Sequence, residues 1–436
     1  MPTPIARLGY HYYPDDRHFT QKDLTTWLPI LESLGARWLT LRASPERAVP
    51  ESFLRGLAET GIAPIVHIPA RVGSISAADL SPLLTSYGRW GVRHVVVFDR
   101  PNQRLPWEAS DWGRTLLVER FLDRLVPILQ AQRTAGLQPV LPPLEPGGDY
   151  WDTAFLGAVL ASLARRGQQS LLHDLAIGIY AWTFDKPLDW GAGGPSRWPE
   201  ARPYHTPQGC QDQIGFHIFD WYSAVAASIA STPLPMLVLA GGAAPSTSKN
   251  GLGPDTHAET NLAIARALAG GDVPDQVVNF AYYLLAADAG TRDQASAWFP
   301  AIEEPRPVVA ALQRFVGQAA KQPPQPPTKL LRHYILLPER PGETSVQEWA
   351  SVGQYALVFR PVVGFSAREA RLAQQVTIVG DESAVPSSVE GELRAAGCTV
   401  QRVARSDRGS AAAALRPTPA EILASYQPSF AGVDHG

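Results

Sequence analysis

Apolar stretches alternate with longer amphipathic stretches along the chain up to about residue 320. Each apolar stretch has the composition of a buried strand, and each amphipathic stretch has the apolar spacing of a helix that packs on a sheet. Several helical stretches end at a glycine just before the next strand, as helices commonly do. The predicted strands are residues 8–13, 38–42, 63–68, 92–98, 137–141, 175–180, 234–239 and 277–283, and the predicted helices are 22–34, 51–60, 77–90, 114–134, 151–165, 213–229, 257–269 and 307–316.

Eight strand–helix units of this kind favour a parallel (β/α)8 barrel, the TIM barrel, within the α/β class. An open, doubly wound parallel sheet is the alternative, because it is built from the same units. The short returns from helix to strand fit closure of the sheet. We therefore predict a barrel over residues 1–320.

The pattern changes at residues 321–328, which contain four prolines. Each proline ring fixes φ and restricts the residue before it, so this segment is predicted to be an extended linker. A small α/β domain is predicted over residues 329–408 and a partly ordered tail over 409–436. The small domain is expected to contain strands at 334–337, 355–359, 376–379 and 399–403 and a helix at 384–395.

Composition narrows the function classes. Hydrophobic residues make up 45% and charged residues 18% of the chain, and the formal net charge is −3. These values exclude wholesale disorder, leave no basic footprint for nucleic acid, and leave no polybasic patch for a membrane surface. No apolar run reaches the roughly 18 residues that a membrane span needs. The two cysteines, Cys210 and Cys398, lie far apart and form no disulfide framework.

The first residues lack the basic and apolar regions of a signal peptide. We therefore expect a cytoplasmic protein, or a cell-envelope or extracellular protein if a leader has been removed. No cofactor or metal is expected. Ala240-Gly-Gly242 is not followed by a dinucleotide-binding or Walker pattern, and the histidines lack the spacing of metal ligands.

Candidate chemistry lies where the predicted strands end, because the active sites of TIM barrels are built at that face. The residues at these positions are aromatic and polar, with one arginine at the end of the second strand and few carboxylates. They are His11, Arg42, His67, Asp99, Arg100, Asn102, Glu145, Tyr180, Trp182 and Tyr283.

Over residues 5–316 these motifs, taken in order, resemble the large clan of (β/α)8 glycoside hydrolases. Arg42 ends the second strand, where that clan commonly keeps an arginine. Residues 95–102, Val-Val-Val-Phe-Asp-Arg-Pro-Asn, look like the clan's fourth-strand Asn-Glu-Pro motif, and residues 235–242 look like its seventh-strand run ending in Glu-x-Gly. Residues 298–312 resemble its closing segment. The resemblance implies a barrel directed at a polysaccharide or oligosaccharide.

The same alignment of motifs places Arg100 in the slot of the clan's acid/base glutamate and Ala240 in the slot of its nucleophile. Retaining hydrolysis requires two carboxyl groups about 5–5.5 Å apart. Arginine is not a proton donor near neutral pH, and alanine is not a nucleophile. The standard mechanism is therefore predicted to be absent. Glu145 with Asp99, or with another acid of the 145–152 loop, is the alternative catalytic pair, in a displaced geometry.

The loop after the sixth predicted strand, residues 180–205, is long and holds Trp182, Trp190 and Trp198. The chain has 12 tryptophans, and aromatic faces in such a loop can stack on sugar rings. The alternative is that these rings pack inward and fix the loop to the barrel. Both interpretations fit a long functional loop.

Residues 330–408 weakly resemble one copy of a type 2 cell-wall-binding repeat, in the Ile-Val-Gly strand end at 378–380 and the closing Val-x-Arg-Val at 400–403. A plain strand–turn–helix–strand unit gives much the same pattern. Three functions therefore stay open for the whole chain. It is a glycan-binding barrel without the standard mechanism, an active glycoside hydrolase that uses Glu145, or a non-catalytic scaffold.

Overall fold

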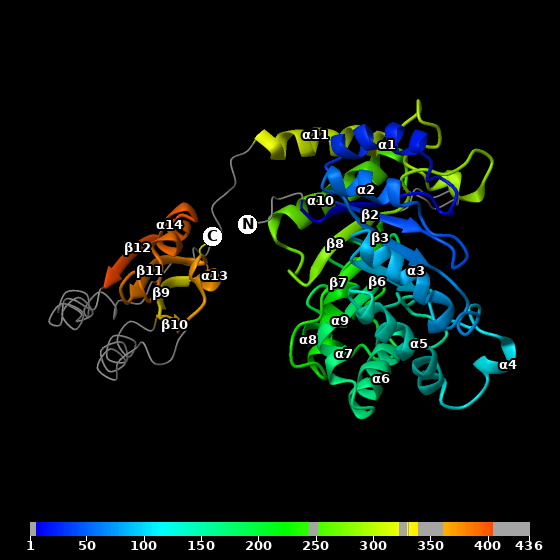
Figure 1. The fold of residues 1–436 in the computed structure, drawn as a ribbon, viewed down its shortest axis with the longest axis horizontal. Helices are drawn as coiled ribbons and strands as arrows, with labels where there is room; N and C mark the ends of the chain where they lie inside the picture. The colour runs from blue at the N-terminus through cyan, green and yellow to red at the C-terminus, as the bar shows by residue number, and fades with distance from the viewer. Residues whose placement is uncertain (1–5, 244–251, 322–328, 330, 339–360, 404–436) are drawn as a thin grey trace. The chain divides into compact units, whose positions relative to one another are not determined.

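The computed structural model describes residues 6–243, 252–321, 329, 331–338 and 361–403. The chain divides into two compact units, Met1–Gln322 and Pro323–Gly436, each treated separately below (Figure 1). Among the described residues, no helix is both long and apolar enough to span a bilayer.

The first unit is built on eight parallel strands in the order β4-β3-β2-β1-β8-β7-β6-β5. A parallel bridge between His94 and Gln138, next to β5, joins the two ends of this sheet and nearly closes the barrel. This confirms the predicted TIM-barrel fold. The strands are β1 (Leu8–His11), β2 (Trp38–Arg42), β3 (Ala63–Ile68), β4 (His94–Val97), β5 (Val140–Leu141), β6 (Ala176–Trp182), β7 (Met236–Gly242) and β8 (Val277–Tyr282).

Helices follow the strands and lie on the outside of the barrel (Figure 1). Two of them begin with a capping box, in which Thr20 pairs with Asp23 and Ser76 with Asp79. The helices are α1 (Gln21–Ser33), α2 (Glu51–Glu59), α3 (Ala77–Arg89), α4 (Ala109–Trp112), α5 (Leu117–Thr134), α6 (Asp152–Arg165), α7 (Gln169–Asp174), α8 (Gly194–Arg197), α9 (Ile218–Ala227), α10 (Pro254–Gly270) and α11 (Pro307–Lys321), with a short 3-10 helix at Arg292–Ala295.

Two hydrophobic layers fix the strand ends in place. Inside the barrel, branched side chains such as Ile65, Val96 and Leu237 are fully buried and pack together. Outside, the apolar faces of the helices bury large rings such as Phe121 and Phe155 against the sheet. A filled interior is typical of TIM barrels, so a polar site in this unit is expected at the strand ends and in the loops that follow them.

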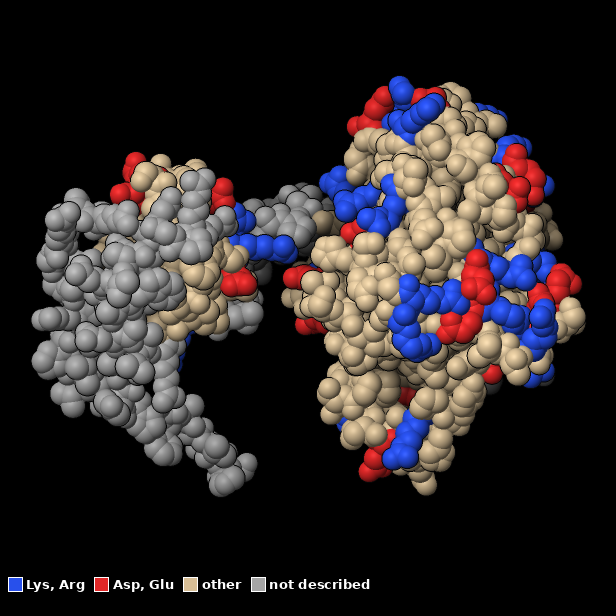
Figure 2. Space-filling model, turned by 60° about the horizontal axis from the view of Figure 1, so that its bottom comes forward, with Lys and Arg blue, Asp and Glu red and all other residues tan. Residues whose placement is uncertain are grey.

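Charged side chains of both signs are intermingled on the face of the barrel unit seen in Figure 2. Oppositely charged side chains of the barrel unit also form ion pairs with one another. For example, Asp111 accepts contacts from Arg114 at 3.3 Å and from Arg124 at 3.2 Å. The visible face therefore carries no broad area of one sign.

The second unit is a four-stranded parallel sheet in the order β10-β9-β11-β12. Leu393 of the helix α14 packs on Tyr334 and Ile378 of this sheet. The predicted strand at 355–359 lies outside the described residues. The elements are β9 (Leu331–Leu336), β10 (Val362–Gly364), α13 (Ala367–Ala370), β11 (Ala373–Val379), α14 (Ser387–Ala395) and β12 (Thr399–Val403).

The residues that carry the repeat resemblance have internal partners in this unit. Arg402 Nε lies 2.9 Å from the carboxylate of Glu390, and its guanidinium also donates to the carbonyl of Gly380. Asp381 Oδ1 accepts from Ser383 N at 3.1 Å, which shapes the turn into α14. These contacts are those of a plain strand–turn–helix–strand unit, and wall binding stays a prediction.

Candidate functional site

The chain turns sharply where β4 ends. Phe98 and Arg100 adopt φ of 73° and 48°, in the left-handed region that residues other than glycine rarely occupy. Backbone hydrogen bonds hold both residues there, from Phe98 N to Ile68 O at 2.9 Å and from Arg100 N to Pro143 O at 3.0 Å. Strained residues that are fixed in this way gather at functional sites. The turn places Asp99 and Arg100 at the carboxyl ends of the strands.

Arg100 is the centre of a cluster that joins the ends of three neighbouring strands. Its Nε lies 2.7 Å from Glu145 Oε2, and its Nη1 lies 3.6 Å from Asp99 Oδ2. Its guanidinium carbon lies 4.7 Å from the centre of the Tyr180 ring, and the Tyr180 hydroxyl donates to Asp99 Oδ1 at 2.7 Å. We call Asp99, Arg100, Glu145 and Tyr180 the mouth network. One guanidinium thus bridges the two carboxylates that were predicted as a catalytic pair.

The mouth network shifts the protonation of its members. Burial and the neighbouring Asp99 raise the pKa of Glu145, while Arg100 acts in the opposite direction. Burial lowers the pKa of Arg100, but Tyr180, Asp99 and Glu145 outweigh it, so the pKa stays above its usual value. Burial and Asp99 raise the pKa of Tyr180 well above its usual value. Arg100 is therefore a fixed cation, and Glu145 takes up a proton more easily than an exposed glutamate.

His11 and His67 lie beside this cluster as neutral rings. Burial, with smaller contributions from His67 and Arg42, lowers the pKa of His11 to about 3. Burial also lowers the pKa of His67, whose Nε2 lies 3.0 Å from the carbonyl of Phe98. The Nδ1 of His11 is buried and has no hydrogen-bond partner among the described residues.

A row of aromatic rings lies along the carboxyl ends of the strands, from Trp182 on β6 through Tyr283 after β8 to His11 on β1. The Trp182 ring lies 5.4 Å from the ring of Tyr283, which in turn lies 5.1 Å from His11, both edge to face. The Tyr283 hydroxyl donates to Asp293 at 3.2 Å. Trp182 and Tyr283 are only partly buried. These rings supply the apolar surface that the mouth network lacks.

Arg42 ends β2 and is exposed. It lines a groove of about 510 Å³ between the loops after β1, β2 and β3. Asp15, Glu46 and Ser44 line the same groove, so its wall carries both charges and hydroxyl groups. The predicted residues His11, Arg42, His67, Asp99, Arg100, Glu145, Tyr180, Trp182 and Tyr283 thus all lie at the carboxyl ends of the strands.

Trp190 and Trp198 have partners inside their own loop. The Trp190 indole donates to Asp212 at 2.9 Å, and Lys186 lies 4.3 Å from the ring centre. The Trp198 indole donates to the carbonyl of Ala192 at 3.1 Å. In the described part of the chain, no hydrogen bond, ion pair or ring contact joins either indole to the mouth network. These contacts fit the inward-packing interpretation, and a sugar contact by either ring stays a prediction.

Asn102 is fully buried and serves the loops. Its Nδ2 donates to the carbonyls of Glu145 and Tyr150, each at 2.9 Å, and its Oδ1 accepts from Glu145 N at 2.8 Å. The amide is therefore committed to backbone groups of the loop after β5. This side chain holds the backbone of Glu145, and a substrate contact by Asn102 stays a prediction.

One cluster was not predicted from the sequence. Asp15, His18 and Asp288 lie close together, although Asp288 is 270 positions from His18. The histidine and Asp15 follow the first strand and Asp288 follows the last. Because the first and last strands of a closed barrel are neighbours, the predicted fold could have indicated that the loops after these two strands lie side by side.

Comparison with known proteins gives only distant likenesses. No family model matches the chain, and no curated protein matches its sequence. A family 39 glycoside hydrolase from Bacteroides cellulosilyticus WH2 is similar in structure, with 13% identity and a TM-score of 0.49 over 72% of this chain and 63% of that one. A GH128 endo-beta-1,3-glucanase from Sorangium cellulosum gives 15% identity and a TM-score of 0.44 over 70% and 97%. A beta-mannanase from Streptomyces thermolilacinus gives 13% and 0.39 over 72% and 89%. These likenesses carry no argument about activity.

Proposed function

We propose that the barrel binds an oligosaccharide or polysaccharide at the carboxyl ends of its strands, without the standard retaining mechanism. The observation that carries the proposal is the juxtaposition of partly exposed Trp182 and Tyr283 with the mouth network. Both rings pack against the cluster that contains Tyr180, and Tyr283 interacts with the charge of Arg100. Sugars present apolar ring faces and hydroxyl groups together. Aromatic faces bind the former, and fixed charges bind the latter.

The same geometry disfavours two-carboxylate hydrolysis. Glu145 and Asp99 both contact the guanidinium of Arg100. A carboxylate nucleophile must reach an anomeric carbon, and a general acid must hold a proton beside the leaving oxygen. With Arg100 between them, both carboxylates are engaged by a cation, and neither is free to attack. The proposed role of the network is to bind hydroxyl groups.

We expect Trp182→Ala to weaken glycan binding at least about tenfold, since the loss of a stacked indole removes about 1.4 kcal/mol or more. Isothermal titration with a panel of soluble oligosaccharides measures the change. Trp190→Ala is the matched variant, from the same loop but with its indole bonded to Asp212, and should change affinity much less. No binding of wild-type protein to any member of the panel would refute the proposal.

The raised pKa of Glu145 supports a second candidate, an active glycoside hydrolase in which this residue is the general acid. In that case the wild-type protein releases reducing sugar from a polysaccharide, and Glu145→Gln abolishes the release. Glu32→Gln, a change of an exposed acid on helix α1, is the control. Sugar release that survives Glu145→Gln excludes this mechanism.

A further inference from the structure

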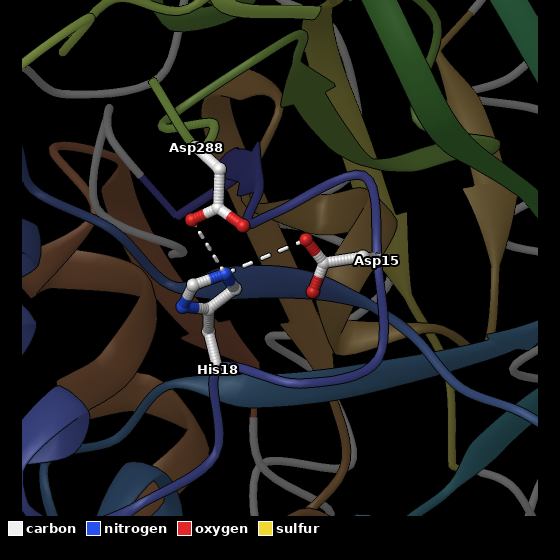
Figure 3. Close-up of side chains that lie close together, drawn as sticks. All are labelled: Asp15, His18 and Asp288. Carbon is white, nitrogen blue, oxygen red and sulfur yellow. Dashed lines mark ion pairs between the residues drawn. The ribbon is translucent and has the colours of Figure 1, made fainter. Parts of the chain in front are cut away.

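Three side chains from opposite ends of the barrel sequence lie close together, in the loops after β1 and β8 (Figure 3). The Nε2 of His18 lies 3.4 Å from Asp15 Oδ2 and 3.1 Å from Asp288 Oδ1. One ligand atom of each residue lies within 4.8 Å of the others. The His18 Nε2 is buried and makes no hydrogen bond of good geometry among the described residues. Three acceptor atoms thus face one point.

The spacing of these atoms matches a tetrahedral metal site. Zinc lies about 2.0–2.2 Å from imidazole nitrogen and carboxylate oxygen, which sets neighbouring ligand atoms in a tetrahedral site about 3.3–3.6 Å apart. The two separations from His18 Nε2, 3.1 and 3.4 Å, lie near the short end of that range. A proton on Nε2 can make a good hydrogen bond to only one of the two carboxylates, whereas a metal ion can be bound by all three ligand atoms at once.

The surrounding contacts hold the ligands in position. The ring of Tyr13 stacks on His18 with centres 3.7 Å apart and an angle of 18°. The backbone of the loop after β8 is bonded to that of β1, from Leu285 N to His11 O at 2.8 Å. Thr291 Oγ1 donates to the carbonyl of Asp288 at 2.7 Å. Positioning of this kind orients metal ligands and strengthens binding.

Arg17 is the competing cation. Its Nη2 lies 3.5 Å from Asp15 Oδ2 and 3.1 Å from Asp288 Oδ2, and its backbone N–H donates to Asp15 Oδ1 at 2.9 Å. The Arg17 side chain is 65% exposed, so these ion pairs contribute little to stability. The guanidinium can keep Asp288 Oδ2, which leaves Asp288 Oδ1 for a metal ion.

We infer that Asp15, His18 and Asp288 form a zinc site with a fourth position open to water or a ligand. Imidazole and carboxylate are ligands that zinc accepts, and three protein ligands with an open position are typical of its reactive sites. The ion joins the loop after β1 to the loop after β8, where the first and last strands of the barrel pair. Because Asp15 also lines the groove beside Arg42, the ion lies next to the proposed glycan surface.

The test is titration of the full chain, stripped with a chelator, with zinc chloride. We expect one ion per chain and a rise of several degrees in the melting temperature. His18→Gln and Asp288→Asn should each weaken binding about tenfold or more, whereas Arg17→Ala should not weaken it. His217→Gln, which removes a comparable histidine 3.1 Å from Asp220, should leave the stoichiometry unchanged.

Circular dichroism and the melting temperature without zinc establish that each variant is folded. Absence of saturable zinc binding in the wild-type chain, or equal binding by both ligand variants and the wild type, would overturn the inference. Glycan titration of the metal-free protein is a separate readout, so a failure of either proposal can be distinguished from a failure of the other.

Discussion

Asn102→Ala should lower the free energy of unfolding of the barrel unit by about 3 kcal/mol or more. The Asn102 side chain is fully buried and makes three hydrogen bonds to backbone groups of the loop after β5. Each buried backbone group that loses its hydrogen-bond partner costs about 1–3 kcal/mol. Denaturant titration measures the change directly.

Gln103→Ala is the control for Asn102→Ala, because it shortens the adjacent, partly exposed side chain. It should change stability by no more than about 0.5 kcal/mol. Asn102→Asp keeps the acceptor for Glu145 N but turns a carboxylate toward two carbonyls, so it should destabilise at least as strongly as alanine. An Asn102→Ala protein within about 1 kcal/mol of wild type would show that the amide is not what fixes these loops.

Asp152→Asn should change how stability depends on pH. Asp152 is fully buried at the start of α6, and its carboxyl accepts from Gly147 N, Gln213 Nε2 and Tyr222 Oη. Burial raises its pKa from 3.8 to about 6, against the effect of those three donors. The protonated form therefore favours the fold.

The sign of the pH effect follows from the order of the two pKa values. As pH rises from about 3 to about 7, the unfolded chain releases this proton first, and the free energy of unfolding falls by about 3 kcal/mol. The asparagine variant lacks this loss. Its stability relative to wild type should therefore rise by about 3 kcal/mol between those pH values.

Asp189→Asn is the control, because it removes an exposed carboxyl group from the loop after β6. It measures how stability changes with pH when the carboxyl group that is removed is not buried. Denaturant titrations of the three proteins at a series of pH values provide the comparison. A constant or falling difference between Asp152→Asn and wild type would mean that the three donors outweigh burial at this carboxyl.

The strands and helices of the barrel follow closely from the sequence. The predictions for residues 38–42 and 63–68 coincide with β2 and β3. Gly61 and Gly91 end α2 and α3 in the left-handed conformation that glycine adopts without strain. Local composition sets these features, so one sequence is enough to find them.

Boundaries were wrong where proline or an unusual backbone angle intervenes. The fifth strand was predicted over 137–141, but only Val140–Leu141 forms regular strand, because Pro139 and Pro142 lack the N–H that a ladder needs. The helix predicted from residue 114 begins at Leu117, after Leu116 adopts a φ of 60°. The helix predicted from residue 257 begins earlier, with Pro254 in its first turn.

The site was predictable in its location but not in its contacts. Strand ends identified Arg100 and Glu145, yet the left-handed turn at Phe98 and Arg100 has no glycine to signal it. The bridge from Arg100 to both carboxylates depends on side-chain conformations in the loops after two strands, β4 and β5. Sequence periodicity carries no information about those conformations.

Hydrogen–deuterium exchange with and without the tightest-binding oligosaccharide tests the central claim most directly, because it reports where the glycan binds. We predict slower exchange in residues 99–104, 145–150 and 180–184, which carry the mouth network and Trp182. Slower exchange confined to the helices outside the barrel, or to residues 361–403 of the second unit, would contradict binding at the mouth.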